Sequence, residues 1–325
     1  MSVKTDQAQD LVAVPDQGGS HTSPAVSVEK SEIFKVWDSA TGTLLTSGQR
    51  RGITAVATGR LAEAGVVVVA HGFGRRGCIE VLNADTGEPV GPPLEWEAVM
   101  DLSIGELGGR PTLVVHASDG IFFINPGDQE PRQVLYANDG RHGGTRFSAL
   151  GRLKGEFVGI TVHAWDPDLT EEWVPDNCLM THMASGEDRT LAQGIGEVTC
   201  VAAGQWGNLD VVFIGGVEGA VTVWCLETGE ELAHFQGHEG EVVSVLFVEV
   251  RKTPLLVSTG ADSYVRVWDC SQQGALLNET GFPDLLGAVA VNDAGVFAGY
   301  GSRVAFLAWT DLGSVAGSSE KTESR

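Results

Sequence analysis

One short pattern, a bulky apolar residue followed by a small or polar one, recurs through the whole chain at a nearly constant interval. It is clearest at residues 265–269 (VRVWD), and related segments are 35–38 (KVWD), 80–83 (EVLN), 122–125 (FFIN) and 222–225 (TVWC). With the tryptophan or its substitute as a marker, the positions are 37, 82, 124, 181, 224, 268 and 307, so the spacings are 45, 42, 57, 43, 44 and 39. A period of about 40 to 45 residues with several short strands is typical of one β-propeller blade.

Length and composition agree with a single ring of such blades. A chain of 325 residues has room for two average domains, but one propeller also uses this length, and 42% hydrophobic residues with 43 glycines fit a globular all-β protein. We therefore expect a single propeller of four-stranded antiparallel blades over residues 11–312. The segments 1–10 and 313–325 have no periodic apolar positions and are expected to be disordered.

The first blade decides the number of blades. Each blade has four strands, which we letter a to d in chain order. Residues 11–14 and 25–28 occupy the positions of the a and b strands of the first blade, whereas residues 15–24 between them resemble a loop. With this blade the ring has seven blades, which is the reading we prefer. The alternative is a six-bladed ring in which residues 33–46 pair with the last blade.

Charge and cysteine usage narrow the class of partner. The net charge of −22 disfavours general binding to nucleic acid or anionic lipid, because both depend on basic residues that neutralise phosphate. The longest apolar runs have the length of a strand, and residues 1–10 do not have the pattern of a secretion signal. Five cysteines without CxxC spacing favour free thiols in a reducing cytoplasm.

The repeat at residues 237–269 resembles the WD-repeat family. In that family a histidine before the a strand, a serine or threonine on the b strand, an aspartate in the b–c turn and the tryptophan of the c strand form a buried hydrogen-bonded chain. The resemblance assigns these roles to His238, Ser258, Asp262 and Trp268. The other repeats keep the period but lose most of this set, and they look like the divergent WD-repeat arrays of actinobacterial proteins. The family implies a binding scaffold and names no ligand.

The common catalytic motifs are absent from the sequence. There is no GxSxG, P-loop or HExxH pattern, and the glycine-rich segment 72–77 lies between two expected strands, with no helix after it to bind phosphate. His116, His142, His163 and His182 have no metal-ligand spacing. We therefore expect no catalytic residue, metal or cofactor, although a propeller fold by itself does not exclude an enzyme.

One insertion interrupts the regular repeat. Residues 164–188 contain seven carboxylates and no lysine or arginine, and Trp173 lies among them beside Glu171 and Glu172. By their order among the expected strands, Arg50 and Arg51 fall in a d–a loop and Arg75 and Arg76 in a b–c loop. In WD-repeat propellers these loops share one face, so the arginines are expected on the same face as the insertion and across the ring from it. A tryptophan offers a large contact area, and arginine pairs with carboxylates or phosphates. These residues are the predicted partner-binding set, with a solvated loop and ordinary surface arginines as the alternative.

The preferred function is a non-catalytic scaffold that binds a protein or peptide on the loop face of the propeller. One alternative is an enzyme whose site lies at the mouth of the central channel, and another is a structural or regulatory subunit of a larger assembly. The sequence does not identify the partner or the oligomeric state.

Overall fold

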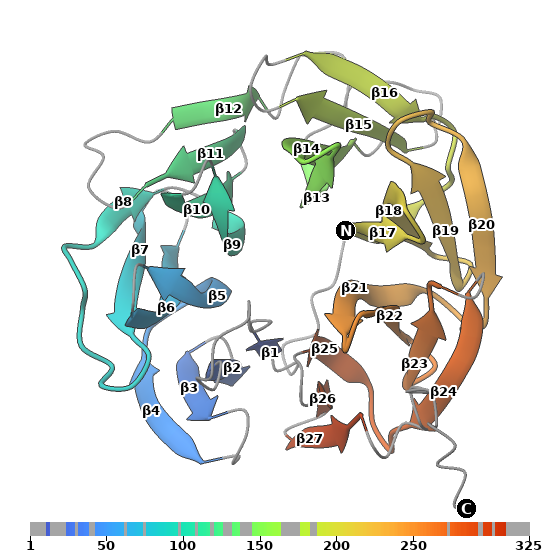
Figure 1. The fold of residues 1–325 in the computed structure, drawn as a ribbon. Coiled ribbons are helices and arrows are strands. Elements are labelled where there is room, and N and C mark those ends of the chain that lie inside the picture. The colour runs from blue at the N-terminus through green and yellow to red at the C-terminus, as the bar shows by residue number, and fades with distance from the viewer. Residues whose placement is uncertain are drawn as a thin grey trace, which may run out of the picture.

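In a computed structural model of the protein, seven antiparallel sheets stand around a central axis like the blades of a propeller (Figure 1). The structure describes residues 11–13, 24–29, 32–38, 43–61, 64–73, 76–96, 99–107, 110–117, 120–125, 132–136, 145–163, 176–182, 187–271, 274–291, 295–300 and 303–309. Among them no helix is long and apolar enough to cross a membrane.

Each sheet is formed by strands that are consecutive in the sequence. The first three sheets contain β1 (Leu11–Ala13), β2 (Pro24–Glu29), β3 (Ile33–Asp38) and β4 (Leu44–Gln49); β5 (Ile53–Leu61), β6 (Ala64–Phe73), β7 (Arg76–Asn83) and β8 (Leu94–Trp96); and β9 (Val99–Leu107), β10 (Arg110–Ala117), β11 (Gly120–Ile124) and β12 (Arg132–Tyr136). The next two contain β13 (Thr145–Leu153), β14 (Glu156–His163), β15 (Asn177–His182) and β16 (Asp188–Ala192); and β17 (Val198–Trp206), β18 (Leu209–Gly216), β19 (Ala220–Cys225) and β20 (Glu231–Gln236). The last two contain β21 (Val242–Val250), β22 (Thr253–Gly260), β23 (Tyr264–Asp269) and β24 (Ala275–Gly281); and β25 (Leu286–Val291), β26 (Gly295–Tyr300) and β27 (Arg303–Ala308).

The expected all-β propeller with four-stranded antiparallel blades is confirmed. Six sheets are complete four-stranded blades, and six is the number of blades in the six-bladed alternative. The seventh sheet, β25–β27, has three strands among the described residues. The closure suggested for a six-bladed ring is not observed, because β3 and β4 pair with each other and with β2 in the first sheet. The first and last sheets instead meet where β1 packs beside β25 and β26. The segments 1–10 and 313–325 lie outside the described residues.

The sheets repeat one another in register. In six of them the innermost strand has a one-residue irregularity near its start, for example between Ile53 and Ala55 and between Val242 and Ser244. The marker position of the sequence repeat keeps a constant place in the third strand, so that Leu82 and Trp268 occupy equivalent positions. The period in the sequence is therefore the period of the structure.

The hydrophobic core lies between the blades. Each of five buried clusters combines side chains from two neighbouring sheets, as where Phe213 packs in one cluster with Leu256 of the next blade. The second strands are buried on both faces, which explains their nearly continuous apolar runs. Burying one such side chain contributes roughly 1.5–3 kcal/mol.

The loops between d and a strands and the turns between b and c strands lie on one face, which we call the loop face. Backbone hydrogen bonds join the two kinds of loop there, for example from Arg50 N to Glu32 O (2.7 Å) and from Phe282 N to Ser263 O (2.9 Å). The loop face is therefore held together by its own backbone, and the candidate sites lie at this end of the blades.

Candidate functional site

The β21–β24 blade holds a continuous buried chain of hydrogen bonds. Trp268 Nε1 donates to Ser258 Oγ at 2.9 Å, Ser258 Oγ lies 2.9 Å from His238 Nε2, and His238 Nδ1 lies 3.0 Å from Asp262 Oδ1. Trp268, Ser258 and His238 are all buried, with His238 only 4% exposed. The structure thus brings together the four residues that the WD-repeat resemblance selected.

Arg266 adds a charge to this chain. Its Nη1 donates to Asp262 Oδ2 at 2.7 Å and lies 2.6 Å from His238 Nδ1. Either neutral tautomer of His238 therefore gives both ring nitrogens a hydrogen-bond partner. In one, Nδ1 donates to Asp262 and Nε2 accepts from Ser258; in the other, Nδ1 accepts from Arg266 and Nε2 donates to Ser258.

Burial and hydrogen bonding set the charges of the pair. Burial lowers the pKa of His238 and outweighs the opposing effect of Asp262, so the imidazole is neutral at pH 7. Burial alone would raise the pKa of Asp262, but hydrogen bonds from His238, the backbone N–H of Glu239 and Arg266 lower it to about 2. Gly260 makes this packing possible, because a Cβ there would collide with the ring of His238.

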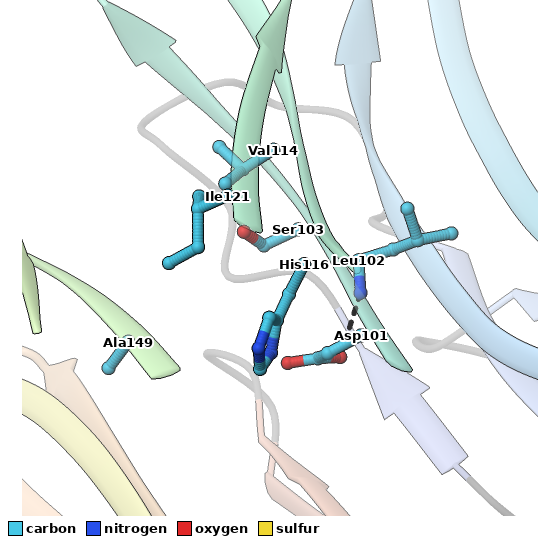
Figure 2. Close-up of a pocket in the computed structure, with 7 residues that line it drawn as sticks. All are labelled: Asp101, Leu102, Ser103, Val114, His116, Ile121 and Ala149. Atoms are coloured by element: carbon cyan, nitrogen blue, oxygen red, sulfur yellow. Dashed lines mark hydrogen bonds between the residues drawn. The ribbon is translucent and has the colours of Figure 1, made fainter. Parts of the chain in front are cut away.

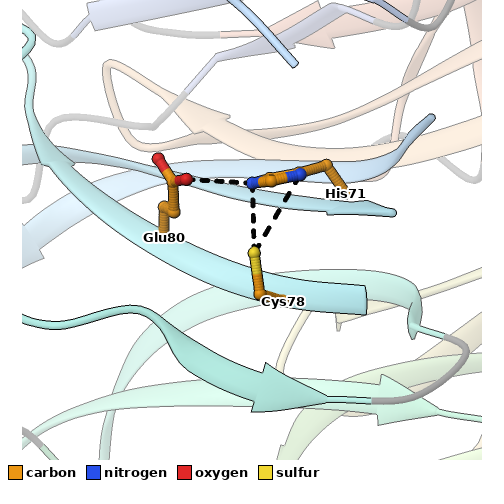
Figure 3. Close-up of side chains that lie close together, drawn as sticks. All are labelled: His71, Cys78 and Glu80. Atoms are coloured by element: carbon orange, nitrogen blue, oxygen red, sulfur yellow. Dashed lines mark hydrogen bonds and ion pairs between the residues drawn. The ribbon is translucent and has the colours of Figure 1, made fainter. Parts of the chain in front are cut away.

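A second polar cluster occupies the corresponding end of the β5–β8 blade (Figure 3). His71 Nε2 lies 3.0 Å from Glu80 Oε1 and 3.2 Å from Cys78 Sγ. His71 pairs with Ile53 as Gly260 pairs with Val242, and Glu80 has the register position of Arg266. Gly260 leaves space for the ring of His238 in the β21–β24 blade. In the β5–β8 blade the equivalent position is occupied by His71.

Arg50 completes this second cluster from the d–a loop. Its Nη2 donates to Glu80 Oε2 at 2.6 Å, and its Nε lies 3.0 and 3.1 Å from the two carboxylate oxygens. Burial alone would raise the pKa of Glu80, but hydrogen bonds from Arg50 and His71 outweigh it and lower the pKa. The cluster remains accessible to solvent, since the side chains of His71, Glu80 and Arg50 are 16%, 20% and 30% exposed.

Cys78 differs from the other cysteines in its accessibility. All five are free thiols, and Cys178, Cys200, Cys225 and Cys270 are buried, whereas Cys78 is partly exposed. Burial raises the pKa of the Cys78 thiol, and the Glu80 carboxylate raises it further while Arg50 opposes the shift. The raised pKa favours the protonated thiol over the thiolate.

A small pocket lies beside the inner strands of the β9–β12 sheet (Figure 2). It is lined by Asp101, Leu102, Ser103, Val114, His116, Ile121 and Ala149. Burial lowers the pKa of His116 to about 4. A general base is most effective with a pKa near 7, so this histidine is poorly matched to acid–base catalysis at neutral pH.

The predicted partner-binding residues are only partly within the described residues. Arg50 is tied to Glu80, and Arg51 beside it is exposed on the loop face. Arg76 begins β7, and nothing further is described of its side chain. Arg75, Glu171, Glu172 and Trp173 lie outside the described residues. Asp176, at the end of the insertion, is buried and accepts a hydrogen bond from Val198 N at 2.9 Å.

The sequence analysis missed four apolar side chains at the loop-face ends of the β21–β24 and β25–β27 sheets, Tyr264, Phe282, Leu285 and Tyr300, which we call the apolar patch. Phe282 and Tyr300 are partly buried against the core between these two sheets. Leu285 is 58% exposed and Tyr264 is 38% exposed, and the rings of Phe282 and Tyr300 are 5.0 Å apart. The adjoining loops carry the exposed acidic residues Glu239, Glu241 and Asp284. The sequence signal for the patch is four apolar residues, two in one loop and two at strand ends. This signal is less conspicuous than the long insertion.

No protein-family model matches the chain, and no curated protein sequence is detectably similar to it. Solved structures of similar fold include the crystal structure of the computationally designed Ika8 protein. It is 21% identical, the match covers 93% of this chain and 97% of that chain, and the TM-score is 0.58. At this identity the match shows the fold alone, and the class of protein is a single β-propeller.

Proposed function

We propose that this protein is a WD-repeat propeller that acts as a non-catalytic scaffold and binds a protein or peptide on its loop face. The apolar patch of Tyr264, Phe282, Leu285 and Tyr300 carries this proposal. Aromatic and large aliphatic side chains at the centre of an interface supply most of the binding energy, and two of these four are well exposed.

The surroundings of the patch suggest the chemistry of the partner. Glu239, Glu241 and Asp284 are exposed beside it, and the whole chain carries a net charge of −22. A complementary partner presents an apolar anchor next to lysine or arginine residues. Electrostatic attraction of this kind mainly accelerates association, and added salt weakens it.

The predicted docking residues extend the proposal around the ring. Arg51 lies on the same face, and the predicted insertion with Trp173, which is outside the described residues, separates β14 from β15 in the sequence. A partner that contacts both regions would meet a basic and an acidic sector of the ring. The patch is the primary contact in this proposal, and Trp173, Glu171, Glu172 and the arginines Arg50, Arg51, Arg75 and Arg76 form the second.

The test begins with partners that co-purify with the full chain from its own host. The affinity of a purified partner is then measured for Tyr264→Ala, Leu285→Glu and Trp173→Ala. Truncating an interface aromatic residue costs about 2 kcal/mol, or roughly thirtyfold in Kd. Leu209→Glu is the matched control, because Leu209 is similarly exposed but begins β18, next to the a–b turn at the opposite end of its blade.

The outcomes separate the possible surfaces. Weaker binding for Tyr264→Ala and Leu285→Glu with an unchanged Leu209→Glu supports the proposal. Loss of binding only in Trp173→Ala, or in a variant with Arg75 and Arg76 changed to glutamate, moves the contact to the insertion or the basic sector. Loss only in Leu209→Glu places it on the opposite face and overturns the proposal.

A further inference from the structure

We propose that His71, Cys78 and Glu80 bind a divalent transition-metal ion of the zinc class at the loop face of the β5–β8 blade. This inference concerns a different site from the apolar patch and does not depend on the proposed scaffold function. It starts from three side chains of different chemistry whose ligand atoms converge on one point.

The distances suit a small tetrahedral ion. The three ligand atoms all lie within 4.8 Å of one another, with Nε2 to Oε1 at 3.0 Å and Nε2 to Sγ at 3.2 Å. Tetrahedral zinc, with bonds of about 2.0–2.3 Å to nitrogen, oxygen and sulfur, separates its ligands by roughly 3.3–3.7 Å. The two pairs that include His71 Nε2 therefore need to move apart by only a few tenths of an ångström, and Cys78 Sγ and Glu80 Oε1 lie within 4.8 Å of each other.

The donor set selects the class of metal. A thiolate and an imidazole favour zinc and its neighbours among the transition metals, whereas magnesium and calcium prefer oxygen ligands only. One sulfur, one nitrogen and one oxygen also leave a fourth position, which water or a partner's side chain would fill. Three protein ligands with an open position are typical of zinc sites that take part in chemistry or in bridging.

Arg50 supports the carboxylate from outside the ligand set. Its guanidinium donates to Glu80 Oε2 at 2.6 and 3.0 Å and to Oε1 at 3.1 Å. Oε1 also faces His71 (Figure 3). Ligating carboxylates commonly accept such a hydrogen bond, which fixes their orientation. The positive charge of Arg50 also balances the two negative ligands together with the metal.

The backbone holds the ligands in place before any metal binds. His71 lies near the end of β6, Cys78 lies opposite it on β7, and Glu80 follows two residues later on the same side of that strand. A side chain at Gly77 would collide with the carbonyl of Trp96, so β8 packs closely behind the site. Ligands on paired strands keep their spacing better than ligands on loops.

The experiment uses the full-length protein, freed of metal with a chelator under reducing conditions and then titrated with Co²⁺ and with Zn²⁺. We expect one Co²⁺ per chain and a sulfur-to-cobalt charge-transfer band, which Zn²⁺ abolishes by displacement. Cys78→Ser should remove the band. His71→Asn and Glu80→Gln should weaken binding at least as much as the roughly ten- to hundredfold loss caused by outer-shell changes.

His234→Asn is the matched control, since His234 is an exposed histidine on β20, far along the chain from the cluster. It should leave the band and the affinity unchanged. A band that survives Cys78→Ser, or full-length protein that shows no thiolate band with Co²⁺, overturns the proposal.

A second measurement needs no variant. Cys78 is the most accessible cysteine, so a thiol-specific disulfide reagent should label it before the four buried thiols. Stoichiometric Zn²⁺ should slow this labelling by at least tenfold, while Mg²⁺ should not. Labelling that is equally fast with and without Zn²⁺ contradicts the site even if a variant fails to fold.

Discussion

The β21–β24 and β5–β8 blades place opposite charges at the same register position. Arg266 of the first blade is buried and pairs with Asp262, whereas Glu80 of the second is partly exposed and pairs with Arg50. Ser258 and Trp268, which continue the network inward in the first blade, correspond to the apolar Val69 and Leu82 in the second. One framework therefore supports either a closed polar network or an open polar cluster above an apolar interior.

The difference between the two blades shows that the burial of a polar network decides whether its residues stabilise the fold or remain available for binding. A buried network must be fully satisfied, because every orphaned group costs desolvation energy, so its residues serve the fold. A cluster at the solvent boundary contributes little to stability and keeps its ligand atoms available. Four predictions test this division, from the largest expected effect to the smallest.

Asp262→Ala should destabilise the protein by about 3–5 kcal/mol, because it leaves the buried Arg266 without its main partner. It also removes the acceptor for Glu239 N, at 3.0 Å. Urea unfolding monitored by circular dichroism gives the change. A loss below about 1 kcal/mol, close to that of a surface pair, would mean that the network is no more important than the open cluster.

The same carboxylate should make stability depend on acid. The pKa of Asp262 is lowered from 3.8 to about 2 in the folded protein, so its contribution is fully present above pH 4 and is lost as the pH falls through 2. The shift corresponds to roughly 2 kcal/mol. The difference in unfolding free energy between wild type and Asp262→Asn should shrink over this window, and a constant difference would contradict the assignment.

His238→Ala should cost about 1–3 kcal/mol, through the partners it leaves unsatisfied at Ser258 and Asp262. Binding measured at low temperature should be unchanged, because the imidazole is buried beneath the loop face. The melting temperature reports the first effect and the affinity of a partner reports the second. An unchanged melting temperature would remove the structural role from this histidine.

Glu80→Gln should change stability by less than about 1 kcal/mol, since it alters a partly exposed pair with Arg50 at the solvent boundary. Chemical unfolding of the metal-free protein gives the value. A loss comparable with that of Asp262→Ala would erase the contrast between the two blades and make the β5–β8 cluster a second structural network.

The sequence predicts most of the fold because each blade is a local unit. The marker positions from Trp37 to Leu307, the alternating a strands and the apolar b strands all lie within short segments, and their period needs no knowledge of distant contacts. The buried chain from His238 to Trp268 could be predicted because one blade keeps nearly the whole motif. The three strands of the last sheet could not, because the period places a blade without fixing how its outer edge is completed.

The polar cluster at His71 could not be predicted from the sequence for a different reason. Its residues have no metal-binding spacing in the sequence, and they meet because β6 and β7 pair in a register that sets His71 opposite Cys78. A prediction of the hairpin register would have found the pair. The apolar patch likewise joins the end of one blade to the start of the next, and such a junction has no fixed pattern.

Every described sheet is built from neighbouring strands, and the first and last sheets meet where β1 lies beside β25 and β26. A chain emerging from the ribosome can therefore complete the described part of each blade as soon as its own strands are available. Such local pairing favours rapid, stepwise folding during synthesis. The final event is the docking of two finished surfaces, so the newest and the oldest parts of the chain meet last.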